Sequence, residues 1–89
     1  MAIFMVERDL RGITMEALGA AQGAAIAQAK SCTSQGTPVR YIRSLFTPED
    51  GRCRCLFEAA TADAVRTVND AAKLPYERIV EAMDLAPPA

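Results

Sequence analysis

The segment from Val39 to Glu58 constrains the fold most, because it reads as two strands joined by a tight turn. The turn is Thr47-Pro48-Glu49-Asp50-Gly51. Proline presets φ at the start of a turn, aspartate tolerates unusual dihedral angles, and glycine adopts positive φ without steric cost. Aromatic, β-branched and other apolar residues flank the turn at period two, which is typical of a β-hairpin.

The register of this hairpin follows if Thr47 and Arg52 close the loop. One face is then almost wholly apolar, and its predicted pairs are Phe46 with Cys53, Ser44 with Cys55, and Ile42 with Phe57. The other face mixes charged and apolar side chains, and its predicted pairs are Leu45 with Arg54, Arg43 with Leu56, and Tyr41 with Glu58. The second face suits neither a dry core nor an ordinary solvated surface, so it is the candidate functional surface.

The rest of the chain supplies two helices and two further strands. Alternation predicts a first strand over residues 2–9 and a last strand over residues 77–85. Ala, Gln and Leu favour a helix over residues 15–32, capped by Thr14, and Thr61 can cap a second helix that ends at Leu74-Pro75. Residues 86–89 are predicted to be a frayed tail.

The resulting order is β-α-β-β-α-β, which is the ferredoxin-like arrangement of an α+β fold. Right-handed crossovers place both helices on one face of a four-stranded antiparallel sheet, with predicted strand order 4-1-3-2. With 89 residues, the chain is predicted to be a single domain over 1–89 with one modest core. The opposite face of the sheet, here called the open face, has no helix to cover it.

Composition excludes several classes of function. The net charge of −1 gives no electrostatic case for binding nucleic acid or a membrane surface. There is no histidine, which removes the Ser-His-Asp and Cys-His nucleophile systems and the commonest ligand for transition metals. Three cysteines without a disulfide-framework spacing, and the lack of a signal peptide, favour the cytoplasm.

The open face is predicted to gather charged and aromatic side chains that could bind a ligand: Glu7, Tyr41, Arg43, Arg54, Glu58 and Glu81. Three interpretations remain open: a solvated surface, a homodimer interface, and a ligand or metal pocket. In the third, Glu7 and Glu81 serve as oxygen ligands or a proton-transfer pair, and Arg43 and Arg54 hold an anion. A one-residue slip in the outer strands would turn the two glutamates inward.

The cysteines also have two interpretations. Cys53 and Cys55 are two apart on a strand, so both point toward the helices, and Cys32 could lie nearby. Thiolates could bind a soft metal such as Zn²⁺ or Cu⁺. Buried free cysteine is also a common small apolar residue, and the structural role is the one predicted here.

Three blocks of the sequence resemble a family of small bacterial domains of unknown function, labelled nickel-binding-protein-like. The blocks are Met5-Val6-Glu7-Arg8-Asp9-Leu10-Arg11-Gly12, Val39–Ser44 with Cys55–Ala59, and Leu74–Glu81. The resemblance implies a ferredoxin-like fold, a homodimer and a divalent metal such as nickel. Imidazole is a favoured nickel ligand and this chain has none, so no nickel ligands are carried over.

Together these observations predict a cytoplasmic, homodimeric binding domain whose open face is its interface. The alternative is a small enzyme with an acid/base site at Glu7 or Glu81. The sequence contains no recognisable catalytic constellation, and it names neither a ligand nor a reaction.

Overall fold

The computed structural model describes residues 1–88, so Ala89, the last residue of the predicted tail, lies outside the described residues. The element order confirms the prediction: β1 (Ala2–Asp9), α1 (Met15–Ser34), β2 (Val39–Thr47), β3 (Arg52–Ala59), α2 (Ala62–Ala71) and β4 (Arg78–Ala82). The sheet order is β2-β3-β1-β4, which is the predicted order read from the other edge. All three strand pairs are antiparallel.

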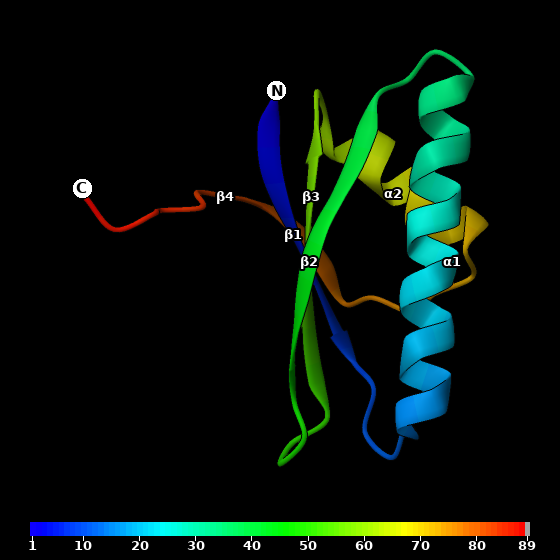
Figure 1. Ribbon diagram of the computed structural model, residues 1–89, viewed down its shortest axis with the longest axis vertical. Helices are drawn as coiled ribbons and strands as arrows, with labels where there is room; N and C mark the ends of the chain where they lie inside the picture. The colour runs from blue at the N-terminus through cyan, green and yellow to red at the C-terminus, as the bar shows by residue number, and fades with distance from the viewer. Residues whose placement is uncertain (89) are drawn as a thin grey trace.

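Both helices lie on one side of the sheet (Figure 1). Helix α1 packs over β2, and α2 packs over β3 and β4. The other side of the sheet carries no helix, and the C-terminal segment leaves the molecule on that side. Neither helix therefore covers the open face.

The helices begin where the sequence indicates. The Thr14 hydroxyl accepts a hydrogen bond from the Ala17 amide, and the Thr61 hydroxyl accepts one from the Ala64 amide. Each side chain thereby satisfies one of the amides that a helix leaves unpaired at its start. Helix α1 continues to Ser34, two residues beyond the predicted end at position 32.

The core lies between the helices and the inner face of the sheet. Its fully buried side chains include Val6, Phe57, Val65 and Val68, and Cys53 and Cys55 lie beside them. Alternation along β3 is regular, with odd-numbered residues buried and even-numbered residues on the open face. This is the pattern expected of a sheet covered on one side.

The predicted hairpin register is correct next to the turn and wrong farther away. Arg43 pairs with Leu56, Ser44 with Cys55, Leu45 with Arg54 and Phe46 with Cys53, as predicted. The register then shifts between Tyr41 and Arg43, so that Ile42 is an extra residue in β2. Such a bulge re-aims the preceding side chain. Tyr41 consequently pairs with Phe57 on the helix side, and its predicted place on the open face was wrong.

The strand β4 is shorter than predicted and its faces are reversed. Ile79 pairs with Val6 and packs against the core, while Arg78 pairs with Glu7. Glu81 pairs with Phe4 and is therefore on the helix side, at an exposed sheet edge. The predicted open-face position of Glu81 was wrong because burying Ile79 is favourable and an edge carboxylate remains hydrated there.

Candidate functional site

The open face is built of three rows of side chains that cross the four strands. The first row is Arg78, Glu7, Arg54 and Leu45; the second is Val80, Met5, Leu56 and Arg43; the third is Ala82, Ile3, Glu58 and Arg40. The middle row is apolar over three strands, and charged side chains flank it. This is the arrangement of an interface core with a polar rim.

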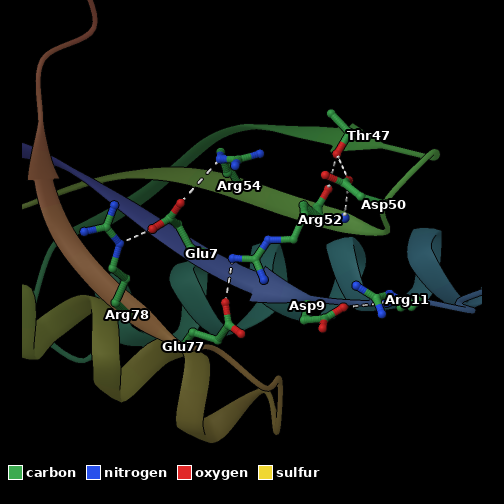
Figure 2. Close-up of polar contacts among 9 residues, drawn as sticks. All are labelled: Glu7, Asp9, Arg11, Thr47, Asp50, Arg52, Arg54, Glu77 and Arg78. Carbon is green, nitrogen blue, oxygen red and sulfur yellow. Dashed lines mark hydrogen bonds and ion pairs between the residues drawn. The ribbon is translucent and has the colours of Figure 1, made fainter.

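Glu7 is the central charged residue of the first row. Its side chain lies between Arg54 of β3 and Arg78 of β4 (Figure 2). Arg54 Nε is 3.4 Å from one carboxylate oxygen, and Arg78 Nε donates a hydrogen bond to the other. Glu7 as a whole is 8% exposed, so this carboxylate is held by two cations in a nearly closed position.

The two arginines set the charge state of Glu7. The hydrogen bond from Arg78 lowers the pKa of this carboxyl most, and the positive charges of Arg78, Arg54 and Arg52 lower it further, while burial opposes them. An ionised carboxylate paired on both oxygens is a poor general acid. The local electrostatics therefore favour a structural or binding role over acid/base catalysis.

The remaining ion pairs of this side of the sheet are peripheral. Arg52 Nη2 lies 2.5 Å from Glu77 Oε1, next to the Glu7 cluster (Figure 2). Arg40 pairs with Glu58 at 3.1 Å at the other end of the face. Exposed pairs of this kind contribute little to stability, so they serve mainly as the charged rim.

The predicted site residues are only partly brought together. Glu7 and Arg54 are in contact, as predicted. Arg43 and Glu58 are on the open face, but Arg43 pairs with Asp84 at 3.3 Å and Glu58 pairs with Arg40. They form separate contacts and do not join the Glu7 cluster.

The two misplaced residues lie elsewhere. The hydroxyl of Tyr41 is hydrogen-bonded to Gln22 and Ser44 on the helix side. Glu81 is exposed at the β4 edge, and the β4 residue that contacts Glu7 is Arg78. Arg78 was not among the predicted site residues. If Ile79 rather than Val80 is assigned to the inner face of β4, alternation places Arg78 opposite Glu7 on the open face.

A groove of about 410 Å³ lies between α1 and the edge strand β2, away from the ion-pair cluster. Ile26, Ala29 and Val39 form its apolar part, Lys30 adds a positive charge, and Arg40, which is paired with Glu58, also lines it. Its chemistry suits an apolar molecule that carries an anionic group. The groove depends on how α1 packs against β2, so the sequence contained no local signal for it.

Titration of Glu7 provides a test of this electrostatic description. By carboxyl NMR we expect its midpoint below the ordinary value of about 4.3. Because the folded pKa is lowered, the stabilisation is present above the unfolded pKa and lost as pH falls through the folded pKa. The difference in unfolding free energy between the wild type and Glu7→Gln should therefore shrink in acid. A midpoint near 6 would contradict the pairing and make Glu7 a candidate catalytic acid.

Comparison with known proteins identifies relatives of the whole fold. A family model described as "Nickel responsive protein SCO4226-like" matches residues 4–82. The crystal structure of SCO4226 from Streptomyces coelicolor A3(2) superposes with a TM-score of 0.80 at 29% sequence identity, covering 96% of this chain and 100% of that one. No protein with a curated functional description matches the chain.

The residues present do not fit a nickel site. The chain contains no histidine. Within residues 1–88, no group of three or more cysteine, aspartate or glutamate side chains is placed to hold a metal ion. The carboxylate of Glu7 is already paired with two arginines. The nickel expected from the family resemblance therefore has no evident ligand set in this part of the chain.

Neither helix in the described part of the chain has the length and hydrophobicity needed to cross a membrane.

Proposed function

Since this chain belongs to the SCO4226-like family of nickel-responsive proteins, we propose that it is a homodimeric binding domain whose subunits meet through their open faces. The observation that carries this proposal is the apolar middle row Val80, Met5 and Leu56 on a sheet face that no helix covers, with a charged row on one side and a half-charged row on the other. Apolar surface that remains open on a small domain is characteristic of an interaction site.

Further exposed apolar residues lie on the same side of the sheet. Leu45 is 66% exposed at the end of the first row. The C-terminal segment leaves on this side, with Met83 77% and Leu85 78% exposed (Figure 1). A stable interface buries about 800 Å² on each partner. The C-terminal segment would add area to that of the sheet.

A binding role is favoured over catalysis by the state of the two glutamates. An acid/base enzyme needs a carboxyl group without a cation partner, in apolar surroundings that raise its pKa. Glu7 is paired on both oxygens, and Glu81 is exposed at the sheet edge. Three free cysteines support a location in the reducing cytoplasm.

Met5→Lys is expected to dissociate the dimer. Met5 lies in the centre of the middle row, between Val80 and Leu56, so neither directly paired neighbour could neutralise the new charge. We expect the dissociation constant measured by sedimentation equilibrium to rise at least about 30-fold, which corresponds to about 2 kcal/mol.

Met15→Lys is the matched control for this substitution. Met15 is 73% exposed at the start of α1, on the opposite side of the molecule. The control should dimerise as the wild type does, and thermal melts should show that both variants are folded. A monomeric wild type, or equal weakening by both substitutions, would refute the proposed interface.

A further inference from the structure

A buried arginine on the helix side of the sheet lacks a carboxylate partner. Arg8 is 2% exposed. Its guanidinium donates to the Pro75 carbonyl and to Cys55 Sγ, both at 3.2 Å. None of the ion pairs within residues 1–88 includes it. Burying an uncompensated charge is costly. A negative charge next to Arg8 would therefore be stabilised by the guanidinium.

A chain of hydrogen bonds ends on the same sulfur. Gln22 Nε2 donates to Tyr41 Oη at 3.0 Å, Tyr41 Oη and Ser44 Oγ are 2.6 Å apart, and Ser44 Oγ donates to Cys55 Sγ at 2.9 Å. Because Ser44 has a single hydroxyl proton and gives it to the sulfur, Tyr41 donates to Ser44. Cys55 Sγ therefore receives hydrogen bonds from both Ser44 and Arg8. A neutral thiol is a weak acceptor, whereas hydrogen bonds to sulfur are a regular feature of metal thiolates.

A second thiol lies within reach of a shared ion. Cys53 Sγ is 3.8 Å from Cys55 Sγ, and the two residues are 2% and 5% exposed. Two sulfurs that bind one metal ion at about 2.3 Å each lie about 3.8 Å apart at a tetrahedral angle, and about 4.6 Å apart on opposite sides of a two-coordinate ion. The two sulfurs are therefore close enough to share one ion, and a two-coordinate ion would move them apart by less than about 1 Å.

The space beside the two sulfurs is of the right size for a single ion. Arg8, Cys53 and Cys55 border a cavity of about 20 Å³, which Leu18 and Leu74 help to close. A cavity needs roughly 10–15 Å³ to hold one water molecule. The cavity therefore has room for one small ion beside the sulfurs.

We propose that Cys53 and Cys55 bind one Cu⁺ ion as a bis-thiolate, with Arg8 as its buried counter-charge. Binding replaces two S–H bonds by two S–Cu bonds, releases two protons to solvent, and leaves copper in its monovalent state. Two thiolates and one Cu⁺ carry one net negative charge, which the guanidinium neutralises. A divalent ion would leave one buried positive charge, so the charge balance selects a monovalent soft metal ion.

The test is an anaerobic titration of the wild-type protein with Cu⁺ in competition with bicinchoninate. We expect one tightly held ion per chain. Cys53→Ser and Cys55→Ser should each weaken binding at least 1000-fold, and Cys32→Ser, which alters the third thiol, should leave binding unchanged. Arg8→Lys, which keeps the charge, should retain more affinity than Arg8→Gln. Complete transfer of copper from the wild type to the competitor, or full binding by Cys53→Ser, would overturn the proposal.

A measurement on the wild type alone covers the case in which the variants do not fold. X-ray absorption at the copper K-edge is measured on the wild type loaded with one equivalent of Cu⁺. We expect two sulfur atoms as the nearest neighbours of the ion. Nearest neighbours that are nitrogen or oxygen, or a single sulfur, would show that the ion is not held by this pair.

Discussion

Replacing Phe57 by alanine is expected to lower the free energy of unfolding by about 3–5 kcal/mol, because the side chain is large and the cavity it leaves cannot collapse completely. Phe57 is 0% exposed at the centre of the core. Its ring meets that of Tyr41 edge to face, with centroids 5.5 Å apart. Small domains are stable by roughly 5–15 kcal/mol in total, so this variant should be close to unfolding at ambient temperature.

Urea denaturation followed by far-UV circular dichroism measures this loss. Phe46→Ala is the matched control, since Phe46 is on the same face of the hairpin but only partly buried. We expect the control to lose clearly less stability. If both substitutions had the same effect, Phe57 would not be the centre of the core.

Replacing Gly51 by alanine is expected to cost about 2–5 kcal/mol, from left-handed backbone strain of about 1–2 kcal/mol together with overpacking of about 1–3 kcal/mol. Gly51 has φ of +69°. An added Cβ would lie 2.5 Å from Arg11 Cα and 2.8 Å from Arg11 N. The loop after β1 crosses the hairpin turn here, and Leu10 donates its amide proton to the Gly51 carbonyl at 2.8 Å.

Gly12→Ala separates the two contributions. Gly12 has φ of +83°, but an added Cβ there would meet nothing within 4 Å. This control should lose only the backbone strain, about 1–2 kcal/mol. Chemical denaturation of the two variants measures the difference, and equal losses would contradict the close contact between Gly51 and Arg11.

Features determined by neighbouring residues could be predicted from the sequence. The turn residues fixed the hairpin register from Arg43 to Leu56, and Thr14 and Thr61 marked both helix starts. Their physical basis is local, since a turn or a cap depends on a few adjacent dihedral angles and hydrogen bonds. The helix order and sheet order then followed from general rules of chain connection.

Features that depend on competition between similar side chains could not be predicted. Tyr41 and Ile42 are both suited to the core, and the bulge gives Tyr41 the position against Phe57. Ile79 and Val80 are also nearly equivalent, so alternation alone did not fix which side of β4 faces inward. Tertiary packing decides both cases, and each decision moves a predicted site residue to the other face.

The burial of Arg8 could have been predicted from the sequence. It follows Phe4 and Val6 at period two, so alternation already placed its side chain among the core residues. The sequence could not show that its partners there would be a carbonyl and a thiol, because Pro75 and Cys55 are distant along the chain.

Intermolecular contacts across the open face are the most direct test of the proposed dimer. In a mixed sample of ¹³C-labelled and unlabelled protein, an isotope-filtered NOE experiment detects only contacts between subunits. We expect such contacts from the methyl groups of Met5, Leu45 and Leu56. An interface formed by the open face would be contradicted if the intermolecular contacts came instead from Leu18 and Ile26 of α1. It would also be contradicted if no such contacts were found at concentrations where sedimentation shows a dimer.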